Sequence, residues 1–310
     1  MRTLICGSFA YDHIMVFADR FKNHILPDKV HMLNVSFLVP EMRREFGGCA
    51  GNIAYNLNLL GGDPVPMGTV GEDFGPYARW MDECGIDRTH VTVVDGTFTG
   101  QAFVITDLDD NQITAFHPGA MDFSHRNKVS DAADVGLGIV SPDGRDGMIE
   151  HARQFSAAGI PFVFDPGQGL PLFDAEELRG LIGQATWLAT NDYEWEMIAE
   201  RTGMTVDDAL GQLEAVITTR GKEGSVIHSR DGRIDVPVVS VAEAKDPTGC
   251  GDAYRAGLLY GLANGLDWQT TGRIASLVGA MKIAEDGTQN HRFTIEQFHR
   301  RYRDEFGSDF

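Results

Sequence analysis

The chain has 310 residues and a mass of 34.0 kDa, enough for one large domain or two small ones. Its formal net charge of −19 argues against nucleic acid or an anionic membrane as a partner. No apolar run is long enough to cross a bilayer, and the N-terminus lacks the pattern of a secretion signal, so we expect a cytoplasmic protein.

The cysteines give no sign of a disulfide framework or a structural zinc site. Cys6, Cys49, Cys84 and Cys250 form no Cys-x-x-Cys pair and have no matching histidine spacing.

Strand-like apolar runs alternate with helix-like segments along most of the chain. We predict strands at residues 4–7, 138–140, 161–164, 187–190 and 216–219. We predict helices at residues 52–60, 147–158, 175–181, 192–202, 251–263 and 270–284. This alternation indicates an α/β fold with a mostly parallel sheet and helices on both faces. We predict a single domain over residues 1–310.

Two segments break the alternation, and they flank the first glycine cluster. Residues 14–46 lack helical periodicity and contain β-like pieces such as 32–39, while residues 97–106 and 113–117 are typical of a hairpin. We predict that segments of about 13–46 and 96–120 form a small β-sheet lid over the main domain. A second hairpin is predicted around residues 230–233.

Polar residues follow several of the predicted strands. Asp12 comes after the first strand, Asn191 follows residues 187–190, and Thr219 begins a glycine-rich turn. Ligands of open α/β sheets bind beyond the carboxyl ends of the strands, so these positions should converge on one site.

Residues 246–252 (DPTGCGD) precede an apolar helix and carry the sharpest chemical signal. The backbone amides of Gly249, Cys250 and Gly251 would lie at a helix N-terminus, where they can stabilise an anion. Asp252 beside them could accept a proton from a hydroxyl. The structural alternative is a glycine turn with an aspartate that stabilises the helix dipole.

Residues 47–52 (GGCAGN) form a second glycine cluster that opens a helix. Such a cluster permits close approach of a ligand, and Asn52 offers both a donor and an acceptor; a structural turn with an asparagine cap is the alternative. The cluster matches neither Gly-x-Gly-x-x-Gly nor the P-loop pattern, which argues against a dinucleotide-dependent dehydrogenase and a P-loop enzyme. The other candidate residues also have structural alternatives. Asn191 and Glu194 match a capping box. Residues 219–224 could be a turn that binds no ligand, and Asp12 alone could be an acidic surface residue.

Together these motifs resemble, in order and spacing over nearly the whole chain, the PfkB (ribokinase-like) kinase family. A finer similarity, to the bacterial adenosine kinases of this type, rests on short matches that include Asp12-His13, residues 36–39 (SFLV), 191–195 (NDYEW) and 287–289 (GTQ).

The resemblance implies a role for each motif residue. Asp252 would be the catalytic base, with an anion hole made by Gly249, Cys250 and Gly251. The substrate-binding residues would be Ser8, Asp12, Ser36, Gly48, Asn52, Phe103, Phe116 and Gln168, of which Asp12, Gly48 and Asn52 hold ribose hydroxyls. The ATP-binding residues would be Asn191, Thr219, Arg220, Gly221, Lys222, Glu223 and Gly224. Asn191 and Glu194 would hold Mg²⁺ through water.

The resemblance also implies ATP and Mg²⁺ as cofactors, stimulation by K⁺ and a homodimer through the lid sheets. Because the chain is acidic, it must hold ATP by backbone amides, helix N-termini and Mg²⁺ rather than by its overall field.

The predicted reaction is transfer of the γ-phosphoryl group of ATP to the 5′-hydroxyl of a purine ribonucleoside. Residues 167–173 lack the arginine expected beside the base in an adenosine-specific relative, which leaves adenosine, inosine and guanosine open. The alternatives are a ribokinase- or fructokinase-type sugar kinase and a non-catalytic nucleoside-binding module. A phosphosugar substrate would need cations, and Arg43 and Arg44 are expected instead to be solvated lid residues. Cys250 replaces the usual Ala or Val, and its place at a helix N-terminus predicts a reactive thiol.

Overall fold

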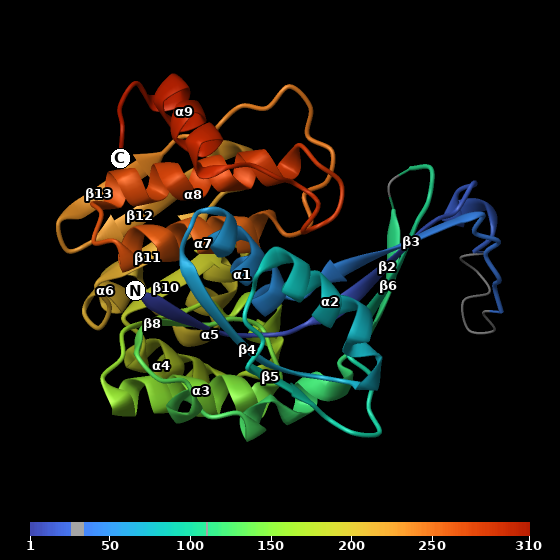
Figure 1. Cartoon of the computed structure of the whole chain (residues 1–310), viewed down its shortest axis with the longest axis horizontal. Helices are drawn as coiled ribbons and strands as arrows, with labels where there is room; N and C mark the ends of the chain where they lie inside the picture. Colours follow the sequence, from blue (N-terminus) through green and yellow to red (C-terminus); the bar gives the residue numbers. More distant parts are fainter. Residues whose placement is uncertain (26–33, 110) are drawn as a thin grey trace.

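The computed structural model describes residues 1–25, 34–109 and 111–310, and within them two sheets form (Figure 1). The larger sheet has the strand order β13-β12-β11-β10-β9-β8-β1-β4-β5. Its strands pair in parallel except around β12, which runs antiparallel to both neighbours. The strands are β1 (Arg2–Cys6), β4 (Asp63–Val70), β5 (His90–Val93), β8 (Val135–Val140), β9 (Phe162–Phe164), β10 (Trp187–Asn191), β11 (Ala215–Thr219), β12 (Ser225–Ser229) and β13 (Gly232–Val236).

Helices cover both faces of this sheet, because its strands are apolar on both sides. Alternate side chains of β1 point to opposite faces: Ile5 packs in the cluster under α1, α2 and α7, and Leu4 in the cluster under α3 to α6. The helices are α1 (Cys49–Leu59), α2 (Gly75–Cys84), α3 (Arg145–Ala158), α4 (Ala175–Gln184), α5 (Asp192–Thr202), α6 (Val206–Leu210), α7 (Cys250–Ala263), α8 (Trp268–Ile283) and α9 (Ile295–Phe306). The predicted α/β fold is confirmed.

The predicted lid is a separate four-stranded sheet that extends away from the main body (Figure 1). Its order is β3-β2-β6-β7, built from β2 (Ala10–Val16), β3 (Glu41–Gly47), β6 (Gly100–Thr106) and β7 (Gln112–His117). β2 follows β1 closely and β3 leads directly into α1, so the base of the lid lies where the first glycine cluster begins.

Three details differ from the sequence-based expectations. Asp12 follows the first strand as expected, but it already belongs to lid strand β2, which begins at Ala10 rather than at about residue 13. Residues 34–39 form no strand, and residues 32–33 of that expected piece lie outside the described residues. β4 was not predicted; it contains Pro64 and Pro66, which usually argue against a central strand. Within the described residues, β5 pairs only with the second half of β4, so these prolines lie where β1 is the one neighbouring strand.

The sequence contains no apolar run long enough to cross a bilayer, and the described helices can be examined for the same property. None of them is long and apolar enough to cross a bilayer.

Candidate active site

The predicted anion loop forms the start of α7. Gly249 adopts a left-handed backbone (φ 78°) and precedes the first helical residue, a conformation that glycine tolerates best. The amide of Cys250 donates to the carbonyl of Pro247 (3.2 Å), and the amide of Ala253 donates to that of Gly249 (3.0 Å). The amides of Gly251 and Asp252 lie between them, in the first turn, where a helix offers no acceptor. They, rather than the Cys250 amide, are the donors best placed for an anion.

Asp252 lies in that turn and contacts α1. Asn52 donates from Nδ2 to Oδ2 of Asp252 (2.8 Å). Burial raises the pKa of Asp252 to about 7; the hydrogen bond from Asn52 opposes this, and the negative charge of Asp165 adds to it. A carboxylate with a pKa near neutrality is well matched to general-base catalysis.

A buried ion pair that the sequence analysis missed lies beside Asp252. Arg255 donates to Asp165 (2.9 Å), and both side chains are almost fully buried. Arg255 is one helical turn after Asp252, and Asp165 directly follows the strand segment that ends at Phe164. The rule that ligands lie beyond the carboxyl ends of strands could have singled out Asp165. The arginine balances part of the negative charge around Asp252.

Asn191 and Glu194 form the capping box that their spacing predicts. Oδ1 of Asn191 accepts from the Glu194 amide (2.7 Å), and Oε2 of Glu194 accepts from the Asn191 amide (2.8 Å). Burial, with the charge of Asp165, raises the pKa of Glu194. Among the described residues, no three His, Cys, Asp or Glu side chains gather to hold a metal ion by themselves. The oxygen atoms of the Glu194 carboxylate and the Asn191 amide are of the type that suits Mg²⁺, which is commonly held by one or two carboxylates, water and substrate phosphates.

Asp12 lies on the lid close to the second glycine cluster. Burial raises its pKa to about 6, and the charges of Asp246 and Glu45 add to this effect. A side chain at Gly47 would place its Cβ 2.4 Å from the Asp12 carboxylate. A larger residue at position 47 would therefore have to displace the Asp12 carboxylate.

The lid register separates the two predicted aromatic residues. Asp12 pairs with Ala102, and Ala102 with Phe116, so Asp12 and Phe116 share one face. Phe103 points to the other face, where its ring stacks on His13 with centroids 4.6 Å apart. Within one chain, the structure brings Phe116 but not Phe103 to the face of Asp12.

The structure places some of the other predicted substrate residues at the second glycine cluster and others away from it. Ser8 is buried, and its Oγ accepts from the amide of Cys49 (3.2 Å) at the start of α1. Gly48 has a positive φ of 87°, and a Cβ there would collide with the Ser8 carbonyl. Ser36 is exposed and adjoins Phe37, which packs on Phe17. The structure thus brings Ser8 and Gly48 to the second glycine cluster. It leaves Ser36 beside the packed rings of Phe17 and Phe37.

The predicted ATP segment is a tight turn between β11 and β12. The Arg220 amide donates to the carbonyl of Gly224 (2.7 Å), and residues Gly221–Glu223 form one turn of 3₁₀ helix. Lys222 and Glu223 are exposed at its tip. Gln168 is also exposed, in the turn after Asp165. Thr219 and Asn191 are the last residues of β11 and β10, and Asp165 directly follows β9, so all three lie at the carboxyl ends of neighbouring strands.

Comparison with known proteins agrees with this arrangement. A family model described as pfkB family carbohydrate kinase matches residues 8–294. The chain belongs to the pfkB family. The nucleoside kinase of Burkholderia thailandensis, solved in complex with inosine, is 52% identical to it with a TM-score of 0.91, over 99% of both chains. The nucleoside kinase of Methanocaldococcus jannaschii is 31% identical over 261 residues, which are 83% of this chain and 85% of that one.

Membership of the pfkB family confirms the expected family, fold and enzyme class, an ATP-dependent kinase. A second structure of the Burkholderia enzyme, in complex with ADP-inosine, has a TM-score of 0.88 and is 54% identical over 99% of this chain and 97% of that one.

A buried lysine supports the anion loop of this pfkB-family kinase. Lys282 of α8 has no exposed surface, and its Nζ donates to the carbonyls of Asp246 (2.6 Å) and Glu285 (3.4 Å). Burial lowers the pKa of its ammonium group. The sequence analysis missed Lys282, because a lysine in an apolar helix gives no local sign that it is buried.

The expected reactivity of Cys250 is wrong in direction. Burial raises the pKa of its thiol to about 11; the ammonium of Lys282 opposes this, and the charges of Asp246 and Asp252 add to it. The helix N-terminus is outweighed by the loss of water around the sulfur.

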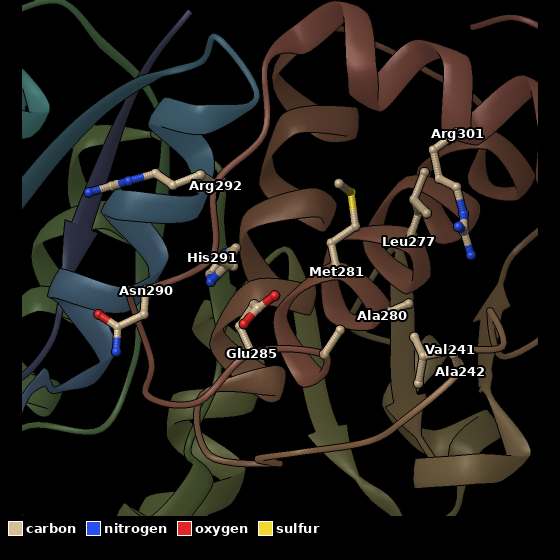
Figure 2. Close-up of a pocket in the computed structure, with 11 residues that line it drawn as sticks. Val241, Ala242, Leu277, Ala280, Met281, Glu285, Asn290, His291, Arg292 and Arg301 are labelled. Carbon is tan, nitrogen blue, oxygen red and sulfur yellow. The ribbon is translucent and has the colours of Figure 1, made fainter.

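A cavity of about 630 Å³ lies between α8 and the segments around residues 241 and 290. Figure 2 shows the side chains that line it. Its lining includes Leu277, Met281, Glu285, His291 and Arg301, and none of the residues predicted for catalysis or ligand binding. The candidate active site is therefore a different region, at the start of α7 and the strand ends.

Proposed function

We propose that the protein transfers the γ-phosphoryl group of ATP to the 5′-hydroxyl of a purine ribonucleoside and releases the nucleoside 5′-monophosphate. One observation carries this proposal: Asp252, with a pKa near 7, lies beside free amides at the start of α7 and is held by Asn52. A carboxylate beside an anion-stabilising helix N-terminus suits phosphoryl transfer to a hydroxyl, in which positioning and charge stabilisation dominate.

The roles of the chain's residues follow from their positions. Asp252 accepts the proton of the 5′-hydroxyl as that oxygen attacks the γ-phosphorus. The amides of Gly251 and Asp252 stabilise the charge on the transferred group. Asp12 accepts hydrogen bonds from ribose hydroxyls, and Phe116, on the same lid face, packs against the base. Mg²⁺ would be held by the nucleotide phosphates with Asn191 and Glu194, and it would neutralise phosphate charge.

Two observations favour a nucleoside over a phosphosugar. The similar Burkholderia enzyme was solved with inosine and with ADP-inosine. The nearby arginines are occupied: Arg43 forms ion pairs with Asp246 (3.4 Å) and Asp286 (3.6 Å), and the guanidinium of Arg44 lies 4.7 Å from the centre of the Tyr11 ring. Neither is free to receive a sugar phosphate without breaking these contacts.

The proposal includes a homodimer through the lid and stimulation by K⁺. Exposed apolar side chains on the lid face opposite Asp12 support a lid interface: Met42, Phe103 and Ile113. Analytical ultracentrifugation tests the dimer, and assays in potassium and sodium chloride at equal ionic strength test the cation. The use of ATP is consistent with the expected cytoplasmic location.

A substrate panel tests the reaction itself. ATP consumption would be measured with adenosine, inosine, guanosine, cytidine, ribose, fructose and fructose 6-phosphate, and the product identified by phosphorus NMR. We expect a purine nucleoside to give the highest kcat/KM and a 5′-monophosphate. A higher kcat/KM with ribose or fructose would establish the sugar-kinase alternative instead.

A further inference from the structure

Gln289 lies outside the predicted site residues, yet its amide is part of a continuous hydrogen-bond chain that ends at Asp252. Its side chain is almost completely buried. Oε1 accepts from the indole Nε1 of Trp80 (2.8 Å), and Nε2 donates to Oδ1 of Asn52 (2.9 Å) and to the hydroxyl of Tyr77 (2.6 Å). Asn52 in turn donates to Asp252 (2.8 Å).

The chemistry of Trp80 sets the direction of this whole chain. An indole N–H can only donate, so the group of Gln289 that faces it must be the carbonyl oxygen. The NH₂ group of Gln289 must then face Asn52, whose carbonyl oxygen accepts. The remaining end of the Asn52 amide is its NH₂ group, and that end faces Asp252. Each amide orientation is therefore dictated by its neighbour rather than chosen freely.

The hydroxyl of Tyr77 strengthens this arrangement. It donates to the carbonyl of Gly47 (3.0 Å), so it presents a lone pair, not a hydrogen, to Gln289. Burial raises the pKa of Tyr77, so the hydroxyl keeps its proton. A Cβ at Gly51 would overlap the Tyr77 oxygen, at 1.9 Å, so the second glycine cluster leaves room for this contact.

We propose that Gln289 is a positioning residue for the reaction proposed above: it holds the Asn52 amide with its NH₂ group toward Asp252, which keeps the base ionised and leaves its second oxygen for the substrate hydroxyl. The inference rests on the proposed function only for the identity of that hydroxyl. The other groups that face Asp252 are the carboxylate of Asp165, the guanidinium of Arg255 and the thiol of Cys49. None of these three orients Asn52.

Gln289→Glu tests the proposal. The introduced side chain, once ionised, only accepts hydrogen bonds, so it opposes the carbonyl oxygen of Asn52; the Asn52 amide then turns its oxygen toward Asp252, which favours protonated Asp252. The matched control is Gln269→Glu, the same change at an exposed position of α8. Carbon-13 NMR of protein labelled at aspartate Cγ, with Asp252→Asn to assign the signal, follows the titration without any substrate.

We expect the Asp252 titration to move upward by about one pH unit or more in Gln289→Glu and to stay unchanged in Gln269→Glu. One unit corresponds to a roughly tenfold loss of kcat at a pH well below the wild-type midpoint, with KM little changed. If Gln289→Glu does not fold, Gln289→Met removes the donor without adding a charge and carries the same test.

Superimposable Asp252 titrations in both glutamate variants, or in Gln289→Met and wild type, would overturn the proposal. Trp80→Phe gives a second readout: without the indole donor, Gln289 can turn its amide, so the Asp252 titration should move in the same direction. Because these titrations need no substrate, they are independent of the substrate panel. A failed panel with shifted titrations would reject the proposed function and retain the role of Gln289.

Discussion

Asn52 and Asp252 are 200 positions apart in the chain, and Nδ2 of Asn52 lies 2.8 Å from Oδ2 of Asp252. This contact joins the first turns of α1 and α7, which begin at the two glycine clusters. It also gives Asn52 a role that differs from the ribose contact expected from the sequence alone. One hydrogen of the Asn52 amide is donated to the base.

The base assignment predicts a specific loss in Asp252→Asn. We expect kcat to fall by roughly 10²–10⁴-fold with KM within about threefold, because the amide cannot accept the hydroxyl proton. Asp267→Asn, at the exposed cap of α8, is the matched control and should behave as wild type. A variant that retains more than about a tenth of wild-type kcat would remove Asp252 from the mechanism.

The same residue predicts the pH dependence of the wild-type enzyme. The pKa of Asp252 is about 7, and only its ionised form accepts a proton, so kcat/KM should rise with pH through 7 and level off above about 8. The residual activity of Asp252→Asn should lack this rise. If kcat/KM of the variant still rises through pH 7, the rise must be caused by the titration of another group.

The lid register predicts different effects for two phenylalanines. Phe116 shares the face of Asp12, so Phe116→Ala should raise KM for a purine nucleoside, by about 2- to 10-fold if the lost stacking contributes 0.5–1.5 kcal/mol. Phe103→Ala removes the same ring from the opposite face and is the matched comparison. Steady-state kinetics with nucleoside and free ribose measure both. A larger KM effect from Phe103 would mean that the other lid face meets the base.

The burial of Cys250 predicts that its thiol reacts slowly with alkylating reagents. With a pKa of about 11, its thiolate fraction at pH 7.5 is roughly 300-fold smaller than that of a free cysteine with a pKa of 8.5. We expect iodoacetamide to inactivate wild type and Cys250→Ala at the same slow rate, and the variant to keep its activity. Rapid inactivation of wild type that Cys250→Ala abolishes would show that the thiol is accessible and ionised.

Asp143 predicts a pH effect on stability rather than on activity. Burial raises its pKa to about 8, against about 3.9 in an unfolded chain. Between those values the folded protein holds a proton that the unfolded chain lacks, so the free energy of unfolding should fall as pH rises through this window. A side-chain amide at this position cannot titrate. The free energy of unfolding of Asp143→Asn should therefore fall less between pH 5.5 and pH 8.5 than that of wild type. Urea denaturation at pH 5.5, 7 and 8.5 measures the slopes, and parallel slopes would contradict the assignment.

The sequence by itself determined the features that depend on neighbouring residues. The period of the apolar runs identified the α/β class, and the hairpin signals identified the lid. The Asn191–Glu194 capping box and the start of α7 at residues 249–252 follow from backbone preferences within one turn, so both were predicted correctly. β4 was not predicted, because prolines usually argue against a central strand. In the described part of the chain, the first half of β4 pairs with β1 alone, which leaves room for Pro64 and Pro66.

Only the tertiary structure decided which distant groups meet and how well water reaches them. The Asp165–Arg255 pair joins residues 90 positions apart, and Gln289 contacts Asn52 across 237 positions. The loss of water around Cys250 reversed the direction expected from its helix terminus, and the strand register placed Phe103 and Phe116 on opposite faces. Burial and register arise from packing the whole chain, so no local pattern in the sequence carries them.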